Sequence, residues 1–73
     1  MLIDVYASRD ENGVWFVEET NLPGLHVDAR SFDDLFARLP GAVRELLEAD
    51  GKAGFVQIDC FAHETIRMQA GAA

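Results

Sequence analysis

The sequence predicts a small α/β domain of the α+β kind, in which the elements follow in the order β-β-β-α-β. Three observations lead to this prediction: residues 2–9 alternate apolar and polar side chains, an Asn-Gly pair at residues 12–13 marks a hairpin turn, and an apolar stripe of helical period runs through residues 32–47. A three-strand meander followed by a right-handed helical crossover places the last strand parallel to and beside the first. We therefore expect a four-stranded mixed sheet of order 3-2-1-4 with one helix on one face.

The first strand is expected over Leu2 to Arg9, and the second is the uninterrupted apolar run Val14 to Val17, which needs cover on both faces. The third, Leu25 to Ala29, follows Pro23, which cannot donate a ladder hydrogen bond, so we expect it at a sheet edge. The fourth is expected to be long, from Phe55 to Met68. The side chains expected to face the core are Ile3, Val5, Ala7, Leu25, Val27 and Ala29, joined on the fourth strand by Val56, Ile58, Cys60 and Ala62.

The helix is expected over residues 32–49, where Ser31 and Asp34 resemble a capping box and Gly51 marks the end. Its apolar stripe consists of Phe32, Leu35, Phe36, Leu39, Val43, Leu46 and Leu47. Pro40 stands in mid-segment, where a proline costs about 3 kcal/mol and normally kinks or ends a helix. Because the stripe keeps its phase across Pro40, we expect either one kinked helix or two collinear pieces.

Composition limits the kinds of binding partner and the cellular compartment that we expect for this chain. The 73 residues form one domain, small enough to need added stabilisation, and a single cysteine, Cys60, excludes an intrachain disulfide. With 13 acidic and 6 basic residues the net charge is −7, which disfavours nucleic acid and favours a basic protein partner. No apolar run has the length of a membrane span and no signal peptide precedes the first strand, so we expect no membrane partner and a cytoplasmic location.

One helix leaves the second face of the sheet uncovered. That face is expected to carry Leu2, Tyr6, Phe55, Phe61 and either Trp15 or Phe16, more apolar area than a small monomer usually exposes. We therefore expect a protein interface there, most simply a homodimer contact, with a tetramer as the alternative. The predicted interface residues are Leu2, Tyr6, Trp15, Phe55 and Phe61.

Catalytic chemistry has little support in the sequence. Asp4 and Asp59 are expected on neighbouring strands, and paired carboxylates can hold catalytic metal ions. Such a site also needs an inward carboxylate from the helix, but the helix acids lie off the apolar stripe. His26, His63 and Cys60 have no ligand or base at a suitable spacing. We predict a protein that is not an enzyme, with no catalytic, cofactor-binding or metal-binding residues.

Several short motifs in one order resemble the HicB-like antitoxin superfamily. They are Gly13-Val-Trp-Phe-Val17, Leu22-Pro-Gly-Leu25, Ala29 and the capped helix start Ser31-Phe-Asp-Asp-Leu35. Leu39-Pro-Gly-Ala-Val43 and Glu45-Leu-Leu-Glu48 are similar to a short subgroup of unknown function within it. The resemblance implies a partial ribonuclease H fold without nuclease activity, which binds and masks a small basic toxin.

Full-length members of that superfamily add a C-terminal module that binds DNA. The present sequence leaves no room for one after its last strand, so we expect no DNA-binding module. Two functions remain open: a protein-interaction domain of the antitoxin type, and a stand-alone homo-oligomeric domain with a small-ligand or regulatory role.

Overall fold

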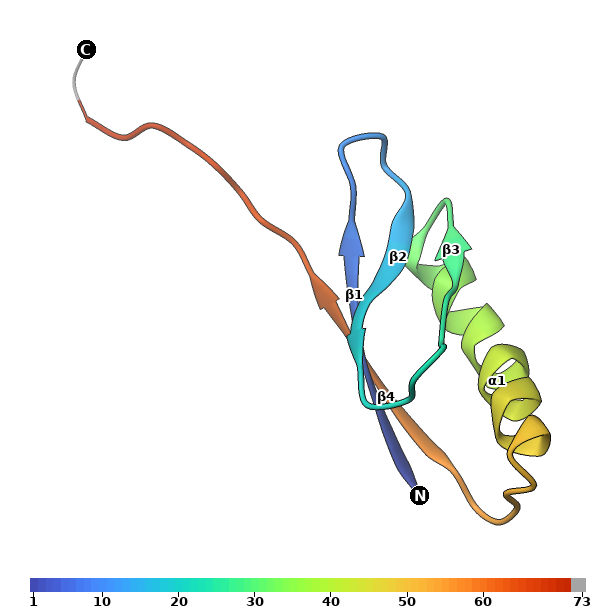
Figure 1. Ribbon diagram of the computed structural model, residues 1–73. Coiled ribbons are helices and arrows are strands. Elements are labelled where there is room, and N and C mark those ends of the chain that lie inside the picture. The colour runs from blue at the N-terminus through green and yellow to red at the C-terminus, as the bar shows by residue number, and fades with distance from the viewer. Residues whose placement is uncertain (72–73) are drawn as a thin grey trace.

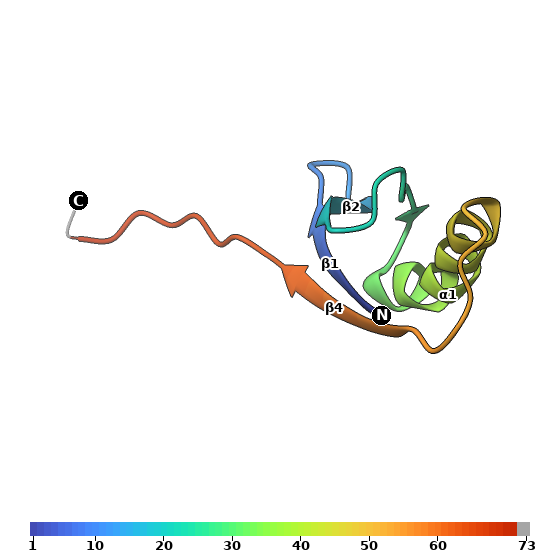
Figure 2. The same ribbon diagram turned by 60° about the horizontal axis from the view of Figure 1, so that its bottom comes forward.

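The computed structural model describes residues 1–71 and contains five elements, which follow in the predicted order. They are β1 (Leu2–Arg9), β2 (Trp15–Thr20), β3 (Asp28–Ala29), α1 (Phe32–Ala49) and β4 (Gln57–His63). The sheet has the order β3-β2-β1-β4, with β1 antiparallel to β2 and parallel to β4. Helix α1 lies on one face of this sheet (Figures 1 and 2). The fold expected from the sequence is therefore confirmed.

The β1–β2 hairpin closes where the Asn-Gly pair predicted a turn. Asp10 Oδ1 accepts hydrogen bonds from the backbone N–H groups of Asn12 and Val14, and Gly13 adopts a φ of 83°. Strand β2 begins and ends later than expected, because the ladder continues through polar residues as far as Thr20, opposite Val5. The register shifts by a bulge opposite Tyr6 and Ala7.

Strand β3 is shorter than expected and lies at the sheet edge, as Pro23 predicted. Pro23 and Gly24 form a turn in which the Leu25 N–H donates to the Leu22 carbonyl, and only Asp28–Ala29 joins the ladder with β2. The side chains of this segment still face the core as expected, since Leu25, Val27 and Ala29 are buried.

Helix α1 is one continuous helix that includes Pro40, so the structure has one helix rather than two pieces. Ser31 Oγ accepts from the Asp34 N–H at 3.1 Å, as the capping pattern predicted. Pro40 is on the exposed side, where water can replace the missing hydrogen bond to the Phe36 carbonyl. The buried part of the stripe is Leu35, Leu39, Val43 and Leu47, whereas Phe36 is 53% exposed. The predicted stripe was therefore too wide on its Phe36 side.

The core lies between α1 and strands β1 to β3, and β4 is covered less. Its core-facing residues Ile58 and Cys60 are half-buried and Ala62 is exposed. Figure 1 shows why: α1 runs on the β3 side of the sheet, while β4 leads away from it toward its C-terminal end.

The long fourth strand expected over Phe55 to Met68 is wrong for the single chain. Ladder pairing runs only from Gln57, opposite Leu2, to His63, opposite Ser8, because β1 offers no further neighbour beyond Arg9. Residues 64–71 continue as an extended segment that leaves the body of the domain (Figures 1 and 2). We call this segment the arm.

Candidate functional site

The candidate site is the sheet face opposite α1, which we call the outer face. Its residues follow from the register of β1 with β2 and β4 and from the contacts of Glu18 with Ser8 and His63. They are Leu2, Asp4, Tyr6, Ser8, Phe16, Glu18, Glu19, Gln57, Asp59, Phe61 and His63.

An apolar group is exposed on the outer face, with Tyr6 and Phe61 at its centre and Leu2 at the N-terminal end of β1. Leu2, Tyr6 and Phe61 are 48%, 43% and 47% exposed, so none is covered by the chain itself. Tyr6 and Phe61 are partners in the β1–β4 ladder, and their rings stack with centroids 5.0 Å apart and planes inclined by 21°. Because both rings are held on paired strands, they lose little conformational entropy when a partner covers them.

Carboxylates surround this apolar group. Asp4 lies directly opposite Asp59, Glu19 lies opposite Tyr6, and Glu18 lies beside Ser8. No Lys or Arg belongs to the outer face as defined above. The face therefore combines exposed aromatic rings with an excess of negative charge, and the nearest cations, Arg9 and Arg67, line the hollow at its Ser8 and Glu18 end.

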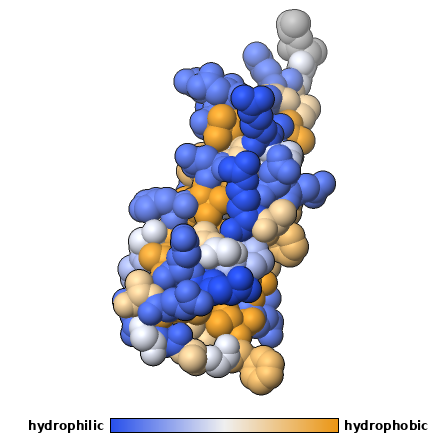
Figure 3. Space-filling view, turned by 90° about the vertical axis from the view of Figure 1, so that its right-hand side faces the viewer, coloured by the Kyte–Doolittle hydropathy of each residue, from blue (hydrophilic) through white to orange (hydrophobic). Residues whose placement is uncertain are grey.

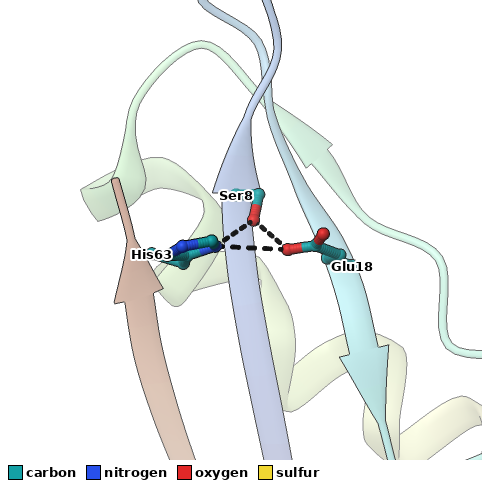
Figure 4. A network of polar contacts seen from close by, with 3 residues as sticks. All are labelled: Ser8, Glu18 and His63. Carbon is teal, nitrogen blue, oxygen red and sulfur yellow. Dashed lines mark hydrogen bonds and ion pairs between the residues drawn. The ribbon is translucent and has the colours of Figure 1, made fainter. Parts of the chain in front are cut away.

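Three polar side chains from three strands meet at one end of the outer face (Figure 4). The buried Ser8 hydroxyl donates to Glu18 Oε2, and His63 Nδ1 lies 3.4 Å from Ser8 Oγ and 3.6 Å from Glu18 Oε2. The hydrogen bond from Ser8, followed by the one from His63, holds the pKa of the Glu18 carboxyl below its ordinary value. A solvent-open hollow of about 520 Å³ adjoins the three residues.

The order of these contacts differs from that of a serine-hydrolase triad. In a triad the imidazole stands between the hydroxyl and the acid and uses one ring nitrogen for each. Here the Ser8 hydroxyl gives its proton directly to Glu18, and the same nitrogen of His63 faces both. The arrangement ties β1, β2 and β4 together, and we assign it that structural role.

The structure brings three of the five predicted interface residues, Leu2, Tyr6 and Phe61, to the outer face. Trp15 does not lie there. It is 8% exposed on the core side, opposite Arg9 in the ladder and edge-on to Phe32 with ring centroids 5.3 Å apart. The sequence left open whether Trp15 or Phe16 faces this side, and the register places Phe16 there, opposite Ser8.

Phe55 also lies away from the outer face. It is 99% exposed and precedes β4, since ladder pairing starts only at Gln57. Its loop follows the C-terminal end of α1, and Phe55 lines a second hollow there.

Sequence reasoning missed the Ser8, Glu18 and His63 cluster. The register supplied part of the signal, because Ser8 and His63 each follow an outer-face aromatic residue by two positions. Glu18 follows the outer-face Phe16 by two positions in the same way, but the strand was expected to end at Val17. Asp4 and Asp59 are neighbours as predicted.

The remaining candidates show no site chemistry. His26 is exposed, and burial raises the pKa of the half-buried Cys60 thiol. Residues 1–71 contain no group of three or more His, Cys, Asp or Glu side chains suited to a metal ion. No helix in that part of the chain combines the length and hydropathy needed to cross a membrane.

The chain is similar to known proteins over about two thirds of its length or more. A domain of unknown function, DUF1902, matches residues 3–70. A UPF0150 protein of Archaeoglobus fulgidus is 35% identical over 48 residues, which are 66% of this chain and 70% of that protein. The crystal structure of a hypothetical protein of the extremely thermophilic bacterium Thermus thermophilus is similar with a TM-score of 0.75 and 34% identity, covering 93% of this chain and 100% of that one.

Proposed function

From the premise that this chain belongs to the DUF1902 family, a family of unknown function, we propose that it is a HicB-like protein-interaction domain. Its outer face binds a small basic protein, and it acts as an antitoxin by masking a toxin of that kind. The observation that carries the proposal is the pair of exposed, stacked rings of Tyr6 and Phe61 among carboxylates.

The apolar centre contributes the hydrophobic part of the binding free energy, which a partner gains when it covers the two rings. Aromatic residues are enriched at the centres of protein interfaces, where a partner excludes water from them. Tyr6 keeps a hydroxyl that can still form a hydrogen bond after its ring is covered. Leu2, in the same strand as Tyr6, extends the apolar area toward the N-terminal end of β1.

The carboxylates select the charge of the partner. Asp4, Asp59, Glu18 and Glu19 lie around the aromatic pair, and the chain has a net charge of −7. A basic protein would be drawn to this face and would offer cations to these groups. Two outer faces pressed together would instead bring their carboxylates into repulsion, so the charge favours a different protein over a second copy here.

The motifs of the sequence support a toxin as that basic partner. The Leu22–Leu25 turn and the helix capped by Ser31 resemble those of HicB-like antitoxins, whose partners are small basic proteins. The match to an uncharacterised family supplies no partner of its own, so the choice of a toxin depends on that resemblance and on charge.

The test measures binding of small basic proteins encoded beside the gene, by calorimetry and by rescue of growth on co-expression. Replacing both rings, Tyr6→Ser with Phe61→Ser, is expected to weaken binding by about 30-fold or more and to abolish rescue. Phe36→Ser is the matched control, because Phe36 is similarly exposed at 53% but lies on α1. Absence of any such binding protein, or equal binding by both variants, would remove the proposal.

The alternative function is a stand-alone homo-oligomeric domain with a small-ligand or regulatory role. The open hollow beside Ser8 favours it, as does the edge of β4 that has no ladder partner within residues 1–71. Salt separates the two functions. A basic partner bound to the acidic outer face is held more weakly as salt rises, whereas self-association through backbone pairing at the edge of β4 depends less on salt.

A further inference from the structure

The arm has the pattern of a half-buried strand, although its apolar side chains are exposed. Its contacts with its own chain are polar: Glu64 forms an ion pair with Arg9 at 2.9 Å, and Thr65 and Arg67 line the hollow beside Ser8. Ile66 and Met68 are 87% and 79% exposed, and with Ala70 they alternate with Thr65, Arg67 and Gln69. The apolar positions continue the phase of Ile58, Cys60 and Ala62, which face the core side of β4. A solvated tail needs no such alternation. The DUF1902 match also runs through the arm to residue 70.

Strand β4 offers the surface that such an arm could complete. It is the last strand of the sheet, so its outward edge has no ladder partner in residues 1–71. Its core-facing side chains Ile58 and Cys60 are only half-buried. An open edge of this kind is a template for another strand.

An apolar hollow of about 410 Å³ lies at the beginning of β4. Val43 and Leu47 of α1 line it together with Phe55, Val56 and Ile58. Figure 3, which looks onto the α1 side, shows apolar side chains at several heights along the molecule, including its lower end, with hydrophilic side chains between them. The arm leaves from the opposite end of β4 and points away from this hollow (Figure 1).

The arm cannot easily fold back onto its own chain. It would have to reverse just after His63, and residues 63–70 contain no Gly or Pro to form a tight turn. A second copy needs no reversal, because a strand that pairs antiparallel with β4 runs from its end back to its beginning.

We propose that two copies of this chain exchange arms. In each copy β4 and the arm form one continuous ribbon, and the two ribbons pair antiparallel about a two-fold axis at His63. In that register Ile66 lies opposite the partner's Cys60, and Met68 lies opposite the partner's Ile58. Since paired residues share a face, the exposed apolar side chains cover the half-buried side of the partner's β4. Ala70 then reaches the partner's Val56, at the apolar hollow.

The charges select this register. It places Arg67 opposite the partner's Asp59, so each copy offers a cation to a carboxylate on the outer face of the other. Shifting the ribbon by two residues in either direction keeps the apolar side chains on one face but separates this pair. The exchange joins the two sheets edge to edge and leaves both Tyr6 and Phe61 pairs accessible, so it is compatible with the binding proposed above.

The first test is sedimentation equilibrium from low to high micromolar concentration. The wild-type chain is expected to form a dimer, and Ile66→Asn with Met68→Asn is expected to raise the dimer dissociation constant about 100-fold or more. The matched control, Thr65→Asn with Gln69→Asn, changes the other side of the arm and should leave the constant within about tenfold. A chain that is monomeric throughout, or one whose dimer responds equally to both variants, overturns the proposal.

The second test exchanges charges and does not depend on the apolar side chains. Arg67→Asp and Asp59→Arg are each expected to weaken the dimer by about tenfold, since each places like charges opposite one another twice. The double variant restores both pairs with their signs reversed and should recover the wild-type constant. Within one chain the two residues are separated along an extended ribbon, so recovery requires contact between copies. If the dimer of the double variant is weakened by the two single effects combined, the proposed register is wrong.

Discussion

Strands β1 and β4 run parallel and side by side, and each alternates apolar and polar residues, yet they are buried to different degrees. The core side of β1 carries Ile3 and Val5 at 3% and 0% exposure, whereas their ladder partners Ile58 and Cys60 remain half-buried. Alternation therefore identifies which face of a strand is apolar. How far that face is covered depends on the position of the strand relative to α1.

The largest expected effect compares two isoleucines that are ladder partners. Ile3→Ala should lower the free energy of unfolding by about 3 to 4 kcal/mol, because a fully enclosed side chain leaves a cavity. Ile58→Ala in the monomer should cost about 1 to 2 kcal/mol, since water already reaches part of the site. Urea unfolding at low micromolar concentration measures both.

Arm exchange adds a concentration dependence to this comparison. If Met68 of a second copy covers Ile58, the cost of Ile58→Ala should grow as protein concentration rises, while the cost of Ile3→Ala stays constant. If the cost of Ile58→Ala does not change with protein concentration, β4 is not part of the proposed dimer contact.

The next effect concerns the outer face, where Tyr6 of β1 and its ladder partner Phe61 of β4 are similarly exposed. Phe61→Ala removes the stacked ring of the Tyr6 pair but leaves no enclosed cavity, so it should cost only about 0.5 to 1.5 kcal/mol of stability. Thermal unfolding followed by circular dichroism checks this value. A loss as large as that of Ile3→Ala would mean that the ring is a core residue, which would weaken the case for a binding face.

The sequence was sufficient where one pattern decided the structure. Period-two and period-3.6 patterns predicted the element order, the buried positions of β1 and the helix bounds, and Ser31 marked the start of α1. Pro40 left the helix continuity open, because an interior proline is tolerated only if its missing hydrogen bond faces water.

The candidate site was predicted less fully, because it depends on pairing between distant segments. The uninterrupted run Val14 to Val17 holds no alternation that could tell Trp15 from Phe16, and the register with Arg9 and Ser8 decided it. Phe55 was assigned to the outer face because strand length was read from apolar content. The length of β4 in a single chain is set by the end of β1 instead.

The smallest expected effect tests the polar tie between β1, β2 and β4. Hydrogen bonds from Ser8 and His63 hold the pKa of Glu18 below its ordinary value of 4.5 in the folded chain. Below 4.5 the unfolded state therefore binds more protons than the folded state, so this contribution to stability is present above 4.5 and is lost as pH falls through the folded pKa. Glu18→Gln should flatten the acid limb of the stability curve by lowering neutral stability a little, because the variant lacks the ionised carboxylate but resembles the protonated wild type in acid. The effect is expected to be small because the carboxylate is exposed. Urea unfolding from neutral pH down to the acid limb measures the free energy of unfolding, with Glu11→Gln in the β1–β2 turn as the control. Identical acid limbs for Glu18→Gln and the wild type would mean that the three strands are held by their ladders alone.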